Sequence, residues 1–291
     1  MSASGLVVVD KAAGWTSHDV VARCRSIFGQ RRVGHAGTLD PDATGVLLVG
    51  LGRATRLLRF LTVLPKTYTT DIVLGTATST LDASGEVTAT FDMREVGPSD
   101  VQAAAAALTG EIEQVPPMVS AVKVGGRPLY ELAREGIEVE RKPRPVTVYR
   151  FETSPDPARP GVYRAVVECS SGTYVRALAD DLGRALGGGA HLDHLRRTQI
   201  GSFGEADMRP LEAIGPDALL SPAEAMRDLE AVRVDDEVAA SIRTGLALDR
   251  VPLGAVGDGP WAMLDATGAL LAVYEATGTD RIRPLVVVAG D

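Results

Sequence analysis

Gly34-His35-Ala36-Gly37-Thr38-Leu39-Asp40-Pro41-Asp42-Ala43-Thr44-Gly45 is the most informative stretch of this chain. Three glycines and one proline within twelve residues predict a sharply shaped turn. The apolar run that follows, residues 46–51, predicts a buried strand. We therefore expect Asp40 on a rigid scaffold. Arginines flank the loop, and a single acid among positive neighbours suits a nucleophile or a general base.

The composition is that of an ordinary globular protein, with 291 residues, 45% of them hydrophobic and 23% charged. This length allows one large domain and a small one. No apolar run approaches the roughly 20 residues that a membrane span needs. The first residues lack the basic region and the apolar core of a signal peptide. We therefore expect a cytoplasmic protein that does not enter a membrane.

Cysteine and histidine spacing gives no sign of a metal site. Cys24 and Cys169 stand far apart without a CxxC pair, which indicates neither a disulfide framework nor zinc binding. We expect both to be small buried residues. His191 and His194 would share one face of a helix, but no acidic or thiol partner stands at ligand spacing. We interpret these two histidines as structural or RNA-facing.

The net charge of −8 argues against a nucleic-acid partner, because such affinity comes largely from Lys and Arg that neutralise phosphates. The distribution of charge reverses this impression. Residues 20–66 hold eight basic and two acidic side chains, a local charge of +6. Residues 205–291 hold seven basic and sixteen acidic ones, a local charge of −9. This asymmetry predicts an oriented basic surface for RNA, with a solvated charged surface as the alternative.

Periodicity and capping residues predict an α+β main body. We expect a helix that is capped by Thr16 or Ser17, runs to about Phe28 and stops at Gly29. A second helix is predicted to start at Ser99, with Gln102 as its capping-box partner, and to end at Gly110. Further expected elements are strands over residues 6–10, 66–78, 146–154 and 163–169, and a helix over residues 173–186.

The character of the chain changes near residue 232. A short helix over residues 236–244 is followed by strands over 261–264, 269–274 and 285–288, and the turn at 266–268 predicts a hairpin. Upstream, residues 117–145 hold several basic residues, glycines and prolines, which suggests an exposed, mobile insertion. The alternative is a surface helical hairpin with solubilising charges.

The opening stretch resembles the catalytic motif of the TruB family of tRNA pseudouridine synthases. Five further blocks match the family in the same order, which is hard to obtain by chance over roughly two hundred residues. They are Val9-Asp10-Lys11-Ala12-Ala13-Gly14-Trp15-Thr16-Ser17, Lys66-Thr67-Tyr68, Pro116-Pro117-Met118-Val119-Ser120-Ala121-Val122-Lys123, Leu129-Tyr130-Glu131-Leu132-Ala133-Arg134-Glu135-Gly136, and Cys169-Ser170-Ser171-Gly172-Thr173-Tyr174-Val175-Arg176.

The resemblance implies the fold and the domains. Residues 1–230 would form a pseudouridine synthase catalytic domain of α+β class, with a mixed, largely antiparallel sheet and flanking helices. The insertion at 117–145 would be a lid that closes on the RNA stem-loop. Residues 231–291 would form a small, mostly-β PUA-like domain. Because this part is acidic, we expect little RNA affinity from it.

The resemblance also implies the reaction. Uridine of the TΨC loop, at position 55 of tRNA, would be flipped out and converted to pseudouridine by an aspartate-dependent rearrangement of the glycosidic bond. No metal or organic cofactor is needed for this reaction. The expected partner is the TΨC stem-loop of tRNA, and we expect a monomer.

Three residues are the predicted catalytic set. By resemblance, Asp40 is the aspartate that attacks the nucleotide or removes a ribose proton. Arg176 matches the arginine that pairs with this aspartate, and a nearby cation keeps a carboxyl group ionised in an enclosed pocket. Tyr68 matches the tyrosine placed against the flipped base, where its ring can stack and its hydroxyl could help move the C5 proton.

Four more residues are predicted to bind the substrate. Tyr174 matches a second pocket tyrosine, and His35 matches a histidine that contacts the RNA beside the flipped nucleotide. Leu195 matches a leucine at the pocket wall. Lys11 matches a lysine that either supports the active-site loop or contacts a phosphate.

Three positions depart from the family pattern. Ala12 stands where proline is usual, Ser79 where an aspartate is common, and Val119 at a position that is usually aromatic. None of these departures removes a group from the predicted chemistry.

Two other interpretations fit parts of the sequence. Asp40-Pro41-Asp42-Ala43-Thr44 fits the DxDxT pattern of magnesium-dependent aspartyl-phosphate phosphatases, although that pattern normally ends an apolar strand and here follows Gly34-His35-Ala36-Gly37-Thr38. The chain could also be a tRNA-binding or tRNA-folding protein whose modification activity is secondary or lost. The folding role is compatible with catalysis.

Overall fold

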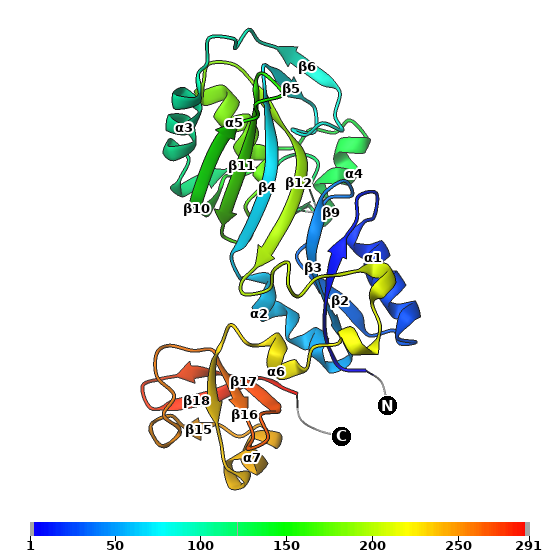
Figure 1. Cartoon of the computed structure of the whole chain (residues 1–291). Coiled ribbons are helices and arrows are strands. Elements are labelled where there is room, and N and C mark those ends of the chain that lie inside the picture. Colours follow the sequence, from blue (N-terminus) through cyan, green and yellow to red (C-terminus); the bar gives the residue numbers. More distant parts are fainter. Residues whose placement is uncertain (1–2, 121, 289–291) are drawn as a thin grey trace. The chain divides into compact units, whose positions relative to one another are not determined.

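The computed structural model describes residues 3–120 and 122–288 (Figure 1). Its contacts divide the chain into two compact units. One unit comprises Met1–Val63 together with Ile200–Asp291, and the other comprises Leu64–Gln199. Among the described residues, no helix is both long enough and apolar enough to cross a membrane.

The first unit is built on a small sheet that carries the Asp40 loop. Strands β1 (Gly5–Lys11) and β2 (Val33–Ala36) both pair antiparallel with β3 (Thr44–Leu51). The two-residue β13 (Arg209–Pro210) adds to β1 in parallel. Seven of the eight residues of β3 are buried, so the strand predicted over residues 46–51 is confirmed. A strand buried on both faces reads as one apolar run, which is why the sequence reveals it.

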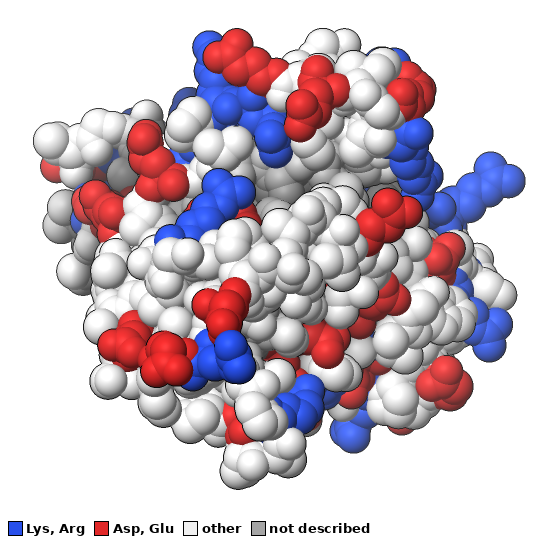
Figure 2. All heavy atoms as spheres, turned by 90° about the horizontal axis from the view of Figure 1, so that it is seen from above, with Lys and Arg blue, Asp and Glu red and all other residues white. Residues whose placement is uncertain are grey.

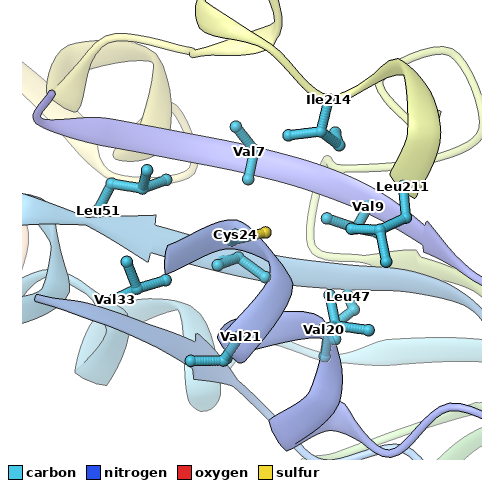
Figure 3. Packing of buried hydrophobic residues seen from close by; sticks show 11 residues of the cluster. Val7, Val9, Val20, Val21, Cys24, Val33, Leu47, Leu51, Leu211 and Ile214 are labelled. Carbon is cyan, nitrogen blue, oxygen red and sulfur yellow. The ribbon is translucent and has the colours of Figure 1, made fainter. Parts of the chain in front are cut away.

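Helix α1 (Ser17–Ile27) packs on this sheet, and its ends follow the local sequence. Thr16 is the N-cap and forms a capping box with Asp19, while Gly29 after the helix has φ of +57°. The predicted helix is therefore confirmed. Figure 3 shows the buried side chains between α1, the strands and the segment around Leu211 and Ile214. The cluster consists of Val7, Val9, Val20, Val21, Cys24, Val33, Leu47, Val49, Leu51, Leu211 and Ile214.

Short helical turns complete this part of the first unit. They are η1 (Gly52–Arg56), α2 (Leu58–Thr62), η2 (Leu211–Ala213), η3 (Pro216–Ala218) and α6 (Pro222–Ala225).

The C-terminal residues form a five-stranded sheet with its own core. Its strand order is β14 (Glu230–Arg233), β16 (Trp261–Leu264), β17 (Leu270–Thr277), β18 (Arg281–Val287) and β15 (Leu248–Asp249). Helix α7 (Asp236–Arg243) and the turn η4 (Val251–Leu253) belong to the same part. Trp261 and Tyr274 are fully buried at the centre of the core. The predicted helix, hairpin and last strand are all present, because each is marked by local pattern.

The second unit is a five-stranded sheet in the order β12, β4, β11, β10, β7. Strand β4 pairs with β11, β11 with β10, and β10 with β7, and all three pairs are antiparallel. The strands are β4 (Lys66–Leu74), β7 (Gly110–Gln114), β10 (Arg144–Pro155), β11 (Val162–Cys169) and β12 (Ala190–Ile200). The sheets and helices together confirm the predicted α+β class with largely antiparallel strands.

Two helices cover one face of this sheet (Figure 1). Helix α5 (Val175–Ala185) confirms the predicted helix and begins two residues later than expected. Helix α3 (Pro98–Ala107) packs against β10 and α5. The predicted cap of α3 was wrong. Gly97 is the N-cap instead, because Pro98 fits the first helical position. The N–H of Gly97 donates to Asp100 Oδ2 at 2.9 Å.

Other local predictions for the second unit need correction. Gly110, with φ of +102°, opens β7 instead of ending α3, which stops at Ala107. The strand predicted over residues 66–78 is split at Gly75 into β4 and β5 (Thr76–Thr78), and β5 pairs with β6 (Val87–Thr90). His191 and His194 share no helix face, because both lie on strand β12.

The insertion predicted at 117–145 contains a two-stranded ribbon, β8 (Lys123–Val124) with β9 (Arg127–Pro128), and helix α4 (Leu129–Arg134). Leu129 and Leu132 are buried, while most of the described side chains around them are exposed or half-buried. Residue 121, part of the matched block at 116–123, lies outside the described residues.

Candidate active site

Asp40 lies in the tight turn between β2 and β3. The N–H of Ala43 donates to the carbonyl of Asp40 at 3.1 Å, which closes the turn. Gly37 and Gly45 stand on either side with φ of +89° and +99°, values that residues with a side chain rarely adopt. The glycines that mark the sequence motif therefore shape the loop that presents Asp40, whose side chain is half-buried.

Two anchors hold this loop to the rest of the first unit. Ser17 Oγ accepts from the N–H of Leu39 at 2.9 Å and donates to the Leu39 carbonyl at 3.2 Å. On the other side of Asp40, the Pro41 carbonyl accepts from Gly14 N at 3.0 Å and from Lys11 Nζ at 2.8 Å. Asp40 is thus fixed through the residue before it and the residue after it.

Lys11 is the centre of the second anchor. Its side chain is only 1% exposed, and Nζ also donates to the carbonyls of Ala12 and Trp15 at 3.0 and 2.7 Å. One ammonium therefore joins the end of β1, the start of α1 and the Asp40 loop. Of the two roles expected for Lys11, these contacts favour support of the active-site loop.

His35 stands on β2, opposite Val49 of β3. Its ring is half-buried and meets the ring of His18 edge-on, with 5.4 Å between centroids and an interplanar angle of 83°. His18 comes from the first turn of α1. The helix that supplies the Ser17 anchor therefore also supports His35.

Tyr68 lies on β4 and is 7% exposed. Strand β4 alternates buried and half-buried residues, so Lys66 and Tyr68 share its buried face. Burial and the positive charge of Arg197 lower the pKa of Lys66 to about 8. Leu195, half-buried, is on the neighbouring strand β12, and the two strands are tied at Thr70 Oγ1, which donates to the Asp193 carbonyl at 2.8 Å.

Tyr174 is the N-cap of α5, and a buried amide holds its backbone. The side chain of Gln114, 2% exposed, accepts from Tyr174 N at 2.9 Å and donates to the Tyr174 carbonyl at 3.2 Å. Gln114 thereby fixes the first residues of α5. The sequence interpretation missed this residue, because the two positions are 60 residues apart and no local pattern joins them.

Arg176 is 4% exposed and binds two segments, the turn at residues 80–82 and the backbone at Val119. Its Nη1 donates to the Thr80 carbonyl at 2.9 Å and lies 3.6 Å from Asp82 Oδ2, while Nη2 donates to the Val119 carbonyl at 2.8 Å. The sequence interpretation did not assign Thr80 or Asp82 to the site. The sequence feature that could have pointed to them is an acidic residue in a turn rich in threonine, serine and glycine.

The seven predicted site residues thus form two groups. Lys11, His35 and Asp40 gather around one loop of the first unit. Tyr68, Tyr174, Arg176 and Leu195 come from β4, the start of α5 and β12 of the second unit. Among the described residues, no three His, Cys, Asp or Glu side chains are grouped to hold a metal ion. Both cysteines are buried as expected.

The basic side chains of residues 20–66 differ in their exposure and in their contacts. Lys66 is buried, and Arg53 and Arg56 donate to the carbonyls of Val288 and Val287 at 3.3 and 2.8 Å. Six of the seven arginines are exposed, namely Arg23, Arg25, Arg31, Arg32, Arg56 and Arg59, and Arg53 is half-buried. On the face shown in Figure 2, basic and acidic side chains lie interspersed.

Known proteins resemble this chain over nearly its whole length. The "TruB family pseudouridylate synthase (N terminal domain)" profile matches residues 25–175, and the "tRNA pseudouridylate synthase B C-terminal domain" profile matches residues 176–236. A "tRNA pseudouridine synthase B" of Nocardia farcinica (strain IFM 10152) is 51% identical over 292 residues, covering 98% of this chain and 93% of that protein. The protein of the same name from Arthrobacter sp. (strain FB24) is 46% identical over 297 residues, with coverage of 98% and 97%.

Solved structures share the fold. A chain of a Cbf5-Nop10-Gar1 complex matches with a TM-score of 0.75 and 27% identity, covering 98% of this chain and 85% of that chain. A chain of an H/ACA RNP bound to a substrate RNA containing 2'-deoxyuridine matches with a TM-score of 0.74 and 24% identity, with the same coverage. At this identity the match indicates a shared fold only. The family profiles and the close relatives agree with the motif around Asp40: the chain belongs to the TruB family of pseudouridylate synthases.

Proposed function

We propose that this enzyme converts uridine at position 55 of tRNA, in the TΨC loop, to pseudouridine. The observation that carries the proposal is the doubly anchored loop of Asp40. A carboxylate held by its neighbours on both sides loses little freedom when substrate binds, which favours a reacting group. The names of the close relatives support tRNA as the substrate.

The proposed roles divide the reaction among the two groups of residues. The enzyme flips the uridine out of its stack, at a cost of about a few kcal/mol that contacts in the pocket recover. Asp40 then attacks the nucleotide or removes a ribose proton, and Arg176 keeps this carboxylate ionised. Tyr68 stacks on the base and assists the proton transfer at C5.

Supporting roles follow for the remaining residues. Tyr174 and Leu195 would line the pocket, and His35 would contact RNA beside the flipped nucleotide. The buried ammonium of Lys11 would hold the Asp40 loop in place. The reaction requires neither metal nor organic cofactor in this proposal.

The molecular context is proposed as well. Residues 1–230 act as the catalytic domain and residues 231–291 as a PUA-like domain, with 117–145 as the lid on the TΨC stem-loop. Exposed basic side chains of this insertion, such as that of Lys123, suit contact with phosphates. The enzyme works as a monomer in the cytoplasm.

The decisive test is tritium release from an unmodified tRNA transcript that carries 5-tritiated uridine. Wild type should release one tritium per tRNA, with or without chelator, and Asp40→Asn should release none. Asp42→Asn is the matched control, because Asp42 is an exposed acid two residues away in the same loop. Release by Asp40→Asn at the wild-type rate would refute the assignment.

The same experiment addresses the rival interpretations. Release that depended on magnesium, together with phosphatase activity, would favour the DxDxT interpretation. A folded wild type that bound tRNA but released no tritium would favour a binding protein. If Asp40→Asn lost turnover but still improved tRNA folding, the folding role would be a second function.

A further inference from the structure

The turn between β5 and β6 presents two acceptors to Arg176. The Thr80 carbonyl and Asp82 Oδ2 both face the same nitrogen, Nη1, at 2.9 and 3.6 Å. We infer that this turn, residues 78–86, sets the position of the Arg176 guanidinium, and that Leu81 and Gly85 are positioning residues for the reaction. The inference rests on the proposed function, because it acts through Arg176.

The carboxylate of Asp82 divides its two oxygens between the turn and the arginine. Oδ1 accepts from Thr80 Oγ1 at 2.6 Å, and from Ser84 Oγ and N at 2.6 and 3.1 Å. Oδ2 is thereby left on the side of Arg176, at 3.6 Å from Nη1. Because Thr80 Oγ1 donates a hydrogen bond to Asp82 Oδ1, any change in the shape of the turn moves both acceptors together.

Leu81 stands between the two acceptors in a conformation that a branched side chain rarely adopts, with φ of +64°. Two hydrogen bonds to β12 hold it there. Leu192 N donates to the Leu81 carbonyl at 3.1 Å, and Ala83 N donates to the Leu192 carbonyl at 2.9 Å. This geometry points the carbonyl of Thr80 and the side chain of Asp82 toward one guanidinium. Strand β12 is therefore the fixed support against which the turn is set.

Gly85 closes the turn from the other side. A Cβ atom there would lie 2.4 Å from Thr80 Oγ1 and 2.7 Å from Thr80 N, closer than real Cβ atoms approach. The φ of Gly85 is outside the left-handed region, so alanine meets no conformational penalty. The third neighbour of that Cβ would be Ser79 Oγ at 3.0 Å. Gly85→Ala therefore mainly displaces Thr80, and with it the carbonyl that binds Arg176.

The test compares Gly85→Ala with Gly97→Ala, whose new Cβ would have Asp100 Oδ2 at 3.5 Å as its nearest neighbour. Single-turnover rates, Kd for an unmodified tRNA transcript, and Tm are measured for both. A displacement near 1 Å costs up to about 100-fold in rate. We expect a loss of about 10- to 100-fold for Gly85→Ala with Kd unchanged, and wild-type behaviour for Gly97→Ala. A wild-type rate for Gly85→Ala would overturn the inference.

A double-mutant cycle separates positioning from general damage to the fold. If Gly85 acts through the acceptors of Arg176, Gly85→Ala combined with Asp82→Asn should be no more than about twofold slower than the slower single variant. A combined loss near the product of the two single losses would show independent routes and overturn the inference.

A second variant keeps the inference testable if Gly85→Ala does not fold. Ser84→Ala removes the hydrogen bond from Ser84 Oγ to Asp82 Oδ1, keeps the one from Ser84 N, and adds no atom. It should lower the single-turnover rate about threefold with Kd and Tm unchanged, whereas an unchanged rate would contradict the inference. An inactive wild type would instead refute the proposed function itself.

Discussion

Lys11 illustrates how one buried side chain can organise a reactive loop. A fully buried ammonium needs strong acceptors, and three carbonyls from residues 12, 15 and 41 meet that need. The bond to the Pro41 carbonyl joins segments that are 30 residues apart, and the other two bonds fix the backbone just after β1. The residue therefore contributes to stability and to the position of Asp40 at the same time.

Replacing Lys11 by methionine should separate these contributions from RNA binding. We expect Lys11→Met to lower the free energy of unfolding by about 2–3 kcal/mol, since charged hydrogen bonds are lost from buried carbonyls. The single-turnover rate should fall at least tenfold while the Kd for tRNA changes little. Urea denaturation and filter binding measure the two effects.

The control for stability is Lys142→Met, because Lys142 is exposed and should change stability by less than about 0.5 kcal/mol. A Lys11→Met variant with wild-type stability and a tRNA Kd raised tenfold would favour the phosphate-contact role instead.

At the scale of elements, a charged turn fastens the β10–β11 hairpin to β4. Asp156 Oδ2 accepts from Arg159 Nη2 at 2.7 Å, and the same nitrogen donates to Asp71 Oδ2 of β4 at 2.6 Å. The Asp156 side chain is 2% exposed. The hydrogen bonds from Arg159 and from Ala158 N lower the pKa of Asp156 to about 2.

This lowered pKa predicts how stability depends on pH. The folded pKa of Asp156 lies below its unfolded value of about 3.9, so its contribution is complete above pH ~4 and is lost as pH falls toward ~2. Wild type should therefore lose stability over this window more steeply than Asp156→Asn, as followed by thermal unfolding at each pH. Parallel curves for the two proteins would contradict the prediction.

At the scale of the whole molecule, the distribution of charge governs RNA binding. The chain carries −8 overall, so binding depends on where the arginines of residues 20–66 are exposed. Arg31 and Arg56 are both exposed, but Arg56 Nη1 also donates to the Val287 carbonyl at 2.8 Å. These two arginines form a matched pair for testing which side chains neutralise phosphates.

The test is the salt dependence of tRNA binding between ~50 and ~200 mM, the range in which phosphate contacts cost much affinity. Arg31→Ala should reduce the slope of log Kd against log salt concentration by about 1 if Arg31 contacts a phosphate. Arg56→Ala should reduce the slope less than Arg31→Ala does, because the bond from Nη1 holds the Arg56 guanidinium at Val287. Equal slopes for wild type and Arg31→Ala would remove Arg31 from the RNA surface.

Local sequence by itself determined the family, the α+β class and most elements. The capping residues of α1 and the β16–β17 hairpin were predicted correctly, because adjacent residues specify caps and turns. The cap of α3 was misplaced by two residues, since the polar Ser99 suits a cap by residue type, whereas Pro98 occupies the first helical position and makes Gly97 the N-cap. Strand β12 was missed entirely, because its polar residues lack the alternation of a half-buried strand.

Only the tertiary structure decided which groups meet. Arg176 and Thr80 are 96 residues apart, and Tyr174 and Gln114 are 60 apart, so no local pattern could pair them. The fold likewise buries Lys66, although this residue counts as surface charge in the sequence, and it ties Arg56 to a carbonyl 231 residues away. Hydrogen bonds to buried backbone depend on how strands and turns pack, and the packing is a property of the whole chain.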